Sequence, residues 1–391
     1  MKSLLNHALP FHGLNRDLKI LFVSNLFASF GDGLTIYLLP LFIRNLKATP
    51  EQVGLLYSVL MIASAVTIIP GGFLAGRYDL KRIMIAGWAV WVPVPLFFAL
   101  ATNWTHFIPA MFFYGVLFSG PASSAYIAGR APEGKMTSTF STLAAAWGLG
   151  YMFAPTVAGY LAEIVGTQWV FALTALFYMV TTLMLVLISN QHPRGLKSSE
   201  VTQAATETLV FKRGRIVYLS ILFGAVMFFL SLVLPLVPQF LKDIYGYDVA
   251  LIGILGSFTY FGGSVLSIVL GKIGDKYGKT APISVAMAAA ALALGVFVSA
   301  NSFMFLIPAS FLRGASFPMW AFIGATIGST VPASSRAKWI SVVQTVAQTA
   351  SILAPYVGGV LYAASPTTPF YIAIAASVTL AFLARFRPFK E

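Results

Sequence analysis

The chain has 391 residues, of which 58% are hydrophobic and only 9% are charged, and its formal net charge is +13. Soluble domains carry roughly 25% charged residues, so this composition excludes a water-soluble domain and indicates an integral membrane protein. The absence of cysteine excludes disulfides and thiolate chemistry, and no basic run is interleaved with aromatic residues as nucleic-acid binding would require.

Apolar segments along the chain predict twelve membrane spans. A helix needs about 20 largely apolar residues to cross roughly 30 Å of hydrocarbon. The segments that meet this requirement are 18–43, 53–75, 83–102, 106–128, 138–160, 169–188, 216–240, 251–270, 281–300, 303–328, 339–362 and 369–386. The first is too long for the apolar core of a signal peptide, so we expect it to remain as a span. The predicted fold class is therefore an all-α integral membrane protein with twelve transmembrane helices.

The distribution of Lys and Arg predicts how these spans are oriented. If the N-terminus is inside, 21 basic residues fall on the cytoplasmic side, and only Arg44, Lys47 and Lys242 fall outside. Cytoplasmic loops carry such an excess of Lys and Arg. We therefore expect a multi-pass protein of the cytoplasmic membrane with both termini in the cytoplasm.

A polar stretch between the sixth and seventh predicted spans divides the chain. Pro, Gly, Ser and Thr are mixed with charged residues there, as in a linker. We expect an N-terminal six-helix bundle over residues 1–190, a cytoplasmic linker over 191–214, and a C-terminal six-helix bundle over 215–391.

Short motifs recur in order in the two predicted bundles. The sequence around Gly54 recurs around Gly253, and Ala-Pro at Pro155 recurs at Pro355, at offsets of 199 and 200 residues. Leu-Pro-Leu at 39–41 recurs at 234–236. Such repeats indicate two pseudo-symmetric bundles that give alternating access to a site near the bilayer midplane.

The loops after the second and eighth spans carry related motifs. Residues 271–279 read GKIGDKYGK, and residues 72–82 read GFLAGRYDLKR. Together with the twelve spans and the repeat, they resemble the major facilitator superfamily of secondary transporters, whose loop motif is G-x-L-A-D-R-x-G-R-K/R. Gly76 replaces the family's aspartate in the first copy, so the resemblance implies a latch role between the bundles only for Asp275. The gate-motif residues are Gly72, Arg77, Asp79, Arg82, Gly271, Asp275, Gly278 and Lys279.

Asp32 is the carboxylate that the sequence places deepest in the membrane. It lies 13 residues after Lys19 and 12 before Arg44, near the midplane of the first span. A charge there costs about 2.5–3.5 kcal/mol on insertion scales, so it should face a cavity or a partner. We interpret Asp32 as a site of proton or cation coupling; the alternative is a structural carboxylate between helices. Polar residues on the same helix face, at spacings of three and four, are Asn25, Ser29 and Thr35.

Arg313 is the matching cation in the tenth span. Its planar donor fork suits a carboxylate or phosphate, so it is a candidate substrate-binding residue, with Ser316 and Trp320 on the same face. The alternative is a permanent ion pair with Asp32.

Two further groups complete the candidate substrate site. The family resemblance implies that spans one, four, seven and ten line the cavity, which adds Tyr114, Ser123 and Tyr126 on the fourth span. A polar stripe on the eleventh span adds Gln344 and Gln348.

Two transport functions fit these patterns. The first is proton-coupled, alternating-access movement of a small organic anion or zwitterion. The second is proton-driven efflux of amphipathic compounds, including cations. An integral-membrane enzyme is disfavoured, because the sequence has no H-E-x-x-H or G-x-S-x-G motif and no paired carboxylates in the spans. We expect a monomer in the lipid bilayer that binds a small molecule and a proton or cation, with no cofactor, metal or nucleic acid.

Overall fold

The computed structural model describes residues 14–133, 135–192, 213–331 and 336–385. Within these ranges every regular element is a helix, and the helices form twelve rods. The predicted linker, 191–214, falls almost entirely outside the described residues, so the boundaries of the two domains stay a prediction.

The first six rods make one bundle and the last six make the other. The helices of the first bundle are α2 (Arg16–Ile36), α3 (Leu38–Asn45), α4 (Pro50–Arg77), α5 (Leu80–Trp91), α6 (Val94–Leu100), α7 (Phe107–Tyr114), α8 (Gly120–Arg130), α9 (Met136–Val165) and α10 (Thr167–Val186). Those of the second are α12 (Arg213–Val233), α13 (Leu236–Tyr245), α14 (Val249–Tyr277), α15 (Ala281–Ser299), α16 (Phe303–Arg313), α17 (Met319–Thr330), α18 (Arg336–Ser351), α19 (Ala354–Ala364) and α20 (Thr368–Arg385).

Each predicted span coincides with one rod, and the all-helical, two-bundle fold class is confirmed. Among the described residues, ten rods are long and apolar enough to cross a membrane. The other two are α9, whose 30 residues include many small and polar ones, and the broken rod α7–α8.

Side chains in the sequence fix where several helices begin. Asn15, Thr49, Asp79 and Asp248 accept hydrogen bonds from backbone N–H groups in the first turns of α2, α4, α5 and α14. These groups have no partner within the helix, and Asn, Asp and Thr are favoured at such positions because their short side chains reach them.

Prolines explain where several rods are interrupted. A proline within a helix removes one hydrogen bond and clashes with the carbonyl four residues earlier. α2, α5 and α18 each end four residues before a proline; the pairs are Ile36 and Pro40, Trp91 and Pro95, and Ser351 and Pro355.

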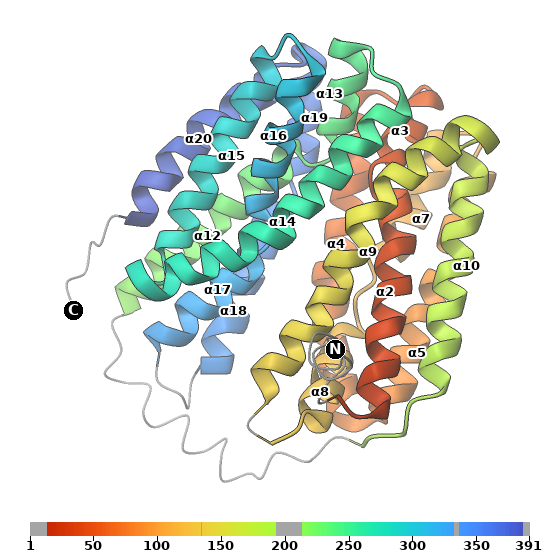
Figure 1. Ribbon diagram of the computed structural model, residues 1–391, viewed down its shortest axis with the longest axis vertical. Helices are drawn as coiled ribbons and strands as arrows, with labels where there is room; N and C mark the ends of the chain where they lie inside the picture. Colours follow the sequence, from red (N-terminus) through yellow and green to blue (C-terminus); the bar gives the residue numbers. More distant parts are fainter. Residues whose placement is uncertain (1–13, 134, 193–212, 332–335, 386–391) are drawn as a thin grey trace, which may run out of the picture.

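The two bundles approach each other at one end and separate toward the other (Figure 1). The converging end is made by the helix ends near residues 45–50, 101–106, 165–167, 245–249, 299–303 and 364–368. The diverging end is made by those near residues 14–16, 77–80, 130–136, 186–192, 213–215, 277–281, 330–336 and 385.

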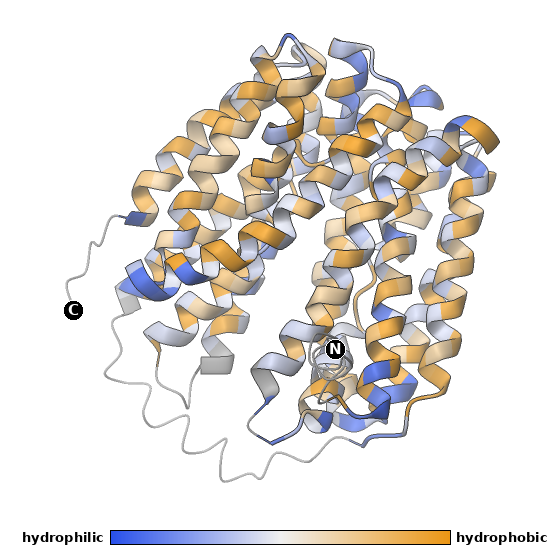
Figure 2. Cartoon of the chain, in the orientation of Figure 1, coloured by the Kyte–Doolittle hydropathy of each residue, from blue (hydrophilic) through white to orange (hydrophobic). Residues whose placement is uncertain are grey.

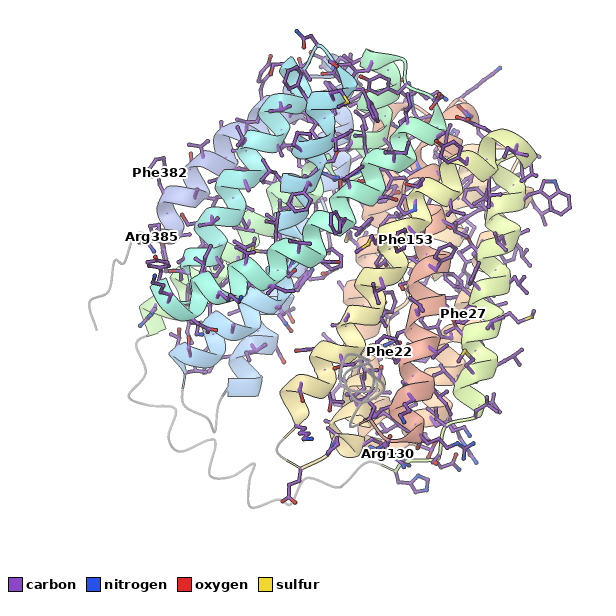
Figure 3. The ribbon with its side chains drawn as sticks, in the orientation of Figure 1. Phe22, Phe27, Arg130, Phe153, Phe382 and Arg385 are labelled. Carbon is purple, nitrogen blue, oxygen red and sulfur yellow. The ribbon has the colours of Figure 1, made fainter. Side chains whose placement is uncertain are left out.

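The outer surface of the rods is apolar, as a lipid-facing surface requires. Hydrophilic residues are concentrated near the two ends of the molecule (Figure 2). Phe382 projects outward from α20 and is 74% exposed (Figure 3).

Candidate functional site

A cavity of about 470 Å³ lies between the bundles at mid-depth. Residues of α2, α4, α7, α12, α14 and α16 line it, so both halves of the chain contribute. Of the residues that line it, only Asp32 and Arg313 are charged, and the rest are mostly aliphatic, aromatic or methionine side chains. The cavity is therefore an apolar site with one carboxylate from the first bundle and one guanidinium from the second.

Three tyrosine hydroxyls surround the carboxylate of Asp32. Tyr114 and Tyr178 donate to its Oδ1, the latter at 2.8 Å, and Tyr151 donates to its Oδ2 at 2.5 Å. Asp32 is only 7% exposed, and these hydrogen bonds offset the cost of removing its polar oxygens from water. Among the described residues, hydroxyl groups of the first bundle thus satisfy this carboxyl group, and no ion pair reaches it.

Tryptophans of α5 hold two of these tyrosines in place. The ring of Trp88 lies 5.5 Å from that of Tyr178, and Trp91 lies 5.8 Å from Tyr178 and 5.6 Å from Tyr114. Trp91 also donates its indole N–H to the carbonyl of Val116 at 2.8 Å. Packing and hydrogen bonding therefore fix the orientation of the hydroxyls before any substrate binds.

Arg313 is the last residue of α16 and faces the cavity from the second bundle. Its Nη1 donates to the hydroxyl of Tyr37 at 3.0 Å, a contact that crosses between the bundles. Among the described residues no ion pair joins Arg313 to Asp32, so the hypothesis of a permanent pair does not hold in this conformation.

Two of the rods that line the cavity are broken at its level, α7–α8 beside Asp32 and α16–α17 at Arg313. The helix breaks after Tyr114 and after Arg313, which occupy equivalent positions 199 residues apart. In the first break, Ser64 donates to the carbonyl of Gly115 at 2.9 Å, and Thr67 accepts from the N–H of Leu117 at 2.9 Å. Side chains of α4 thus satisfy backbone groups that the break exposes, which a membrane interior requires.

The polar stripe predicted on the first span does not line the cavity as a unit. Ser29 donates to the carbonyl of Ala146 on α9, and Thr35 shares a hydrogen bond with Thr174 on α10. Asn25 lies on α2 seven residues before Asp32 and also falls outside the lining. Because α2 packs against both α9 and α10, most of its polar side chains bind neighbouring helices, and only Asp32 of this stripe reaches the cavity.

The other predicted substrate residues divide in the same way. Tyr114, Ser316 and Trp320 line the cavity, whereas Ser123 and Gln344 do not. Gln348 also lies outside the lining, but its amide contacts the sulfur of Met61, a lining residue, at 3.7 Å.

Tyr126 belongs to a polar network at the diverging end instead of the cavity. Its hydroxyl contacts Asp17 at 3.0 Å and the carbonyl of Ser189 at 2.8 Å. Arg130 lies at the end of α8 (Figure 3). It forms an ion pair with Asp17 at 3.0 Å. This network ties the start of α2 to the ends of α8 and α10, and Tyr126 lies outside the lining of the cavity.

The first copy of the loop motif lies within a single bundle. Asp79 is buried, caps α5, and accepts hydrogen bonds from the N–H of Gln191 at 2.9 Å and from His192 at 3.2 Å. Arg77 and Arg82 are exposed, and Gly72 has open space around it. Asp79 thus fixes the chain beyond α10 to the bundle.

The second copy lies on the exposed end of α14. Asp275 forms an ion pair with Lys279 at 2.6 Å, one turn away, and is 77% exposed. Gly278 ends the helix with a φ of +97°, a conformation that favours glycine, and Gly271 has open space around it. The latch role of Asp275 stays a prediction.

Glycine and proline motifs that recur in the sequence meet at the converging end. A Cβ added at Gly54 would lie 2.8 Å from the carbonyl carbon of Pro355, and one added at Gly253 would lie 3.0 Å from that of Pro155. The same pair of motifs therefore forms two equivalent helix crossings, α4 on α19 and α14 on α9.

Polar contacts join the bundles beside these crossings. Lys242 donates to Asn45 at 3.3 Å, and Glu163 accepts from the N–H of Ala250 at 3.0 Å. Together with the crossings, these contacts close the converging end.

Sequence reasoning missed the tyrosines that organise the cavity. Tyr37, Tyr151, Tyr178 and Tyr260 stand in apolar spans where aromatic residues are common. Their hydroxyl groups could have identified them, because a buried tyrosine hydroxyl usually has a hydrogen-bond partner.

Comparisons with known proteins match this chain to a family of membrane transporters. A family model described as Major Facilitator Superfamily matches residues 21–239 and 219–391. The multi-drug resistance efflux pump PmrA of Streptococcus pneumoniae is 26% identical over 273 residues, 67% of this chain and 68% of its own. The multidrug resistance protein MdtG of Enterobacter lignolyticus is 25% identical over 331 residues, 81% of this chain and 76% of its own.

Solved structures share the fold at low sequence identity. A mutant of the nucleoside transporter NupG superimposes with a TM-score of 0.79 at 15% identity, covering 94% of this chain and 98% of that one. A POT family transporter in complex with a thioalcohol-conjugated peptide gives 0.73 at 14% identity, covering 96% and 98%.

Proposed function

This chain belongs to the Major Facilitator Superfamily, and on that basis we propose that it is a proton-coupled exporter of amphipathic organic compounds that carry a negatively charged group. As a family member it is a multi-pass membrane transporter of small molecules and not an enzyme. One observation carries the proposal. Asp32 and Arg313, one from each bundle, are the charged side chains of a single apolar cavity at mid-depth.

We propose that the diverging end faces the cytoplasm. The converging end carries Arg44, Lys47 and Lys242, whereas the other Lys and Arg residues at the described helix ends lie at the diverging end. Basic residues are retained on the cytoplasmic side of membrane proteins. The conformation described here is then closed toward the outside.

Asp32 is the proposed coupling residue. As a carboxylate it accepts hydrogen bonds from Tyr114, Tyr151 and Tyr178. Hydrogen bonds to an ionised group are roughly twice as strong as neutral ones, so protonation of Asp32 weakens all three. Conformations that differ in these hydrogen bonds to Asp32 then change in relative population when Asp32 binds a proton.

Arg313 is the proposed binding residue for the charged group of the substrate. A guanidinium has five N–H donors, and among the described residues Tyr37 is the side chain that accepts one of them. The remaining donors suit a carboxylate, sulfonate or phosphate. The surrounding Leu230, Phe317 and Trp320 favour an apolar substrate body.

A second candidate is the export of amphipathic cations. The relatives named as multi-drug efflux pumps and the aromatic lining favour it. A cationic substrate has to approach Asp32, whose two oxygens already accept three hydrogen bonds. We therefore place the anion first.

Transport by purified protein in proteoliposomes separates these functions. The probes are a fluorescent amphipathic carboxylate and an amine of the same apolar body. We expect Asp32→Asn to abolish transport driven by a pH gradient while substrate exchange persists, because exchange needs no net proton movement. We expect Arg313→Gln to weaken carboxylate transport by about 10- to 150-fold, the value of a charge-assisted hydrogen bond, and to spare the amine. Unchanged carboxylate transport by Arg313→Gln contradicts the proposed substrate, and gradient-driven transport by Asp32→Asn contradicts the proposed coupling.

A further inference from the structure

Tyr151 is bonded to the carboxylate of Asp32 and also contacts the second bundle. Its hydroxyl donates to Asp32 at 2.5 Å, and its ring stacks on Tyr260 of α14 with centroids 4.6 Å apart and planes 15° apart. Phe317 lies edge-on to both rings, at 6.4 Å from Tyr151 and 5.7 Å from Tyr260. One side chain therefore joins the coupling carboxylate of one bundle to an aromatic contact with the other.

The other two tyrosines around Asp32 make different contacts. In the described part of the chain, the ring contacts of Tyr114 are with Trp91 and Phe98, and those of Tyr178 are with Trp88 and Trp91. All of these partners belong to the first bundle. Tyr178 therefore offers a matched comparison, because it also donates a hydrogen bond to the Asp32 carboxylate but makes no ring contact with the second bundle in the described part of the chain.

Close packing leaves the ring of Tyr151 little freedom within its own bundle. A Cβ added at Gly33 of α2 would lie only 3.2 Å from Cδ1 of Tyr151 and 2.6 Å from the Cβ of Ala154. A Cβ added at Gly150 would lie 2.7 Å from the backbone nitrogen of Phe30. Together with the stack on Tyr260, this packing holds the Tyr151 ring between α2 and α14.

The contact continues from Tyr260 to the substrate side of the cavity. The ring of Tyr37 lies edge-on to Tyr260 at 6.4 Å, and its hydroxyl accepts the hydrogen bond from Arg313. Asp32, Tyr151, Tyr260, Tyr37 and Arg313 thus form a continuous series of side chains that crosses the boundary between the bundles.

We infer that Tyr151 is the positioning residue through which the protonation state of Asp32 controls the contact between the two bundles. This inference rests on the proposed coupling role of Asp32. When Asp32 is ionised, it holds the Tyr151 hydroxyl, and the ring stays stacked on Tyr260. Protonation weakens that hydrogen bond, and the stack, worth about 0.5–1.5 kcal/mol beyond its buried area, is then free to separate with the converging end.

The titratable and charged groups that face this carboxylate come from several elements. They are the hydroxyls of Tyr57 on α4, Tyr114 on α7, Tyr151 on α9, Tyr178 on α10 and Tyr260 on α14, followed by Arg313 on α16 beyond Tyr37. Asp32 is the carboxylate among these side chains. Binding of one proton to Asp32 therefore changes the net charge of the whole group by one.

The experiment measures the width of the converging end at acidic and alkaline pH. The natural sequence has no cysteine, so Thr102→Cys and Asn301→Cys place two spin labels in exposed loops, one on each bundle. Pulsed electron resonance on the full chain in lipid nanodiscs then gives the distance between them. Each variant is made in this background, and its gradient-driven transport and substrate exchange are measured in parallel.

We expect acidification to increase the population with a separated converging end. Tyr151→Phe, which keeps the ring, should reduce this acid response about tenfold, and Tyr260→Leu, which removes the stack, should reduce it similarly. Tyr178→Phe should retain most of the response. Gradient-driven transport by Tyr151→Phe should fall below that of Tyr178→Phe, and equal midpoints of thermal unfolding for the two variants show that Tyr151→Phe is folded.

Two results separate failure of the inference from failure of the proposed function. If Asp32→Asn loses the acid response but Tyr151→Phe behaves like Tyr178→Phe, the link through Tyr151 is wrong and the coupling role of Asp32 stands. If Asp32→Asn keeps the acid response, both are wrong.

Discussion

Gly54 offers a direct test of how the converging end is closed. A Cβ at this position would lie 2.8 Å from the carbonyl carbon of Pro355 and 2.9 Å from the Cα of Tyr356 on α19. Carbon atoms pack best at about 3.5–4.0 Å, so Gly54→Ala requires α4 and α19 to separate by about 0.7 Å or more. Both obstacles are backbone atoms, which cannot rotate away as a side chain can.

This separation sets the size of the expected effect. Overfilling a packed contact costs about 1–3 kcal/mol, and here the cost applies to the converged conformation alone. The ratio of separated to converged molecules should therefore rise by about 5- to 150-fold. The spin-labelled positions 102 and 301 report this ratio directly.

A glycine without close neighbours provides the control for Gly54→Ala. A Cβ added at Gly295 of α15 has no atom within 4 Å, so Gly295→Ala tests the change in helix propensity alone. We expect its distance distribution to match that of the parent. The steric reasoning is refuted if Gly54→Ala leaves the distribution unchanged in a protein that still binds and exchanges substrate.

Three further predictions concern other contacts. Gly253→Ala should separate the converging end as Gly54→Ala does, because the two crossings are equivalent; the same distance measurement checks this. Arg130→Ala removes the guanidinium beside Asp17, whose side chain is 5% exposed, and should lower the free energy of unfolding by about 3 kcal/mol in denaturant titrations. Asp275→Asn breaks an exposed ion pair and should change the free energy of unfolding by less than about 1 kcal/mol in the same titrations.

The fold was predictable because the membrane imposes one dominant requirement on the chain. Every predicted span coincides with a rod, and the largest difference is at the end of α14, which continues to Tyr277 where the span was expected to end at residue 270. The positions past 270 are rich in charged and glycine residues, so composition suggested a loop, although the helix extends beyond the apolar layer.

The site was only partly predictable. Asp32 and Arg313 stand out because charges in apolar spans are costly, and both line the cavity. Ser29 and Thr35 share the helical spacing of Asp32 but bind α9 and α10, which spacing alone does not reveal. The role of Tyr151 depends on which helix of the other bundle lies opposite, and no local pattern contains that information.

The repeat motifs gave more than evidence of duplication. Gly54 and Pro355 recur as Gly253 and Pro155, and each glycine meets the proline of the opposite half. Because the two bundles are pseudo-symmetric, one contact between the duplicated motifs is accompanied by a second, equivalent contact.

The interruptions after Tyr114 and Arg313 have a mechanical consequence. A continuous helix resists bending along its whole length, whereas these two rods each consist of short segments joined at the level of the cavity. In the first rod, the direction of α8 is set by the ion pair of Arg130 with Asp17 and by the hydrogen bond of Tyr126 to the same carboxylate. Bending at this joint therefore requires those two contacts at the diverging end to break, whereas a movement of the whole first bundle leaves them intact.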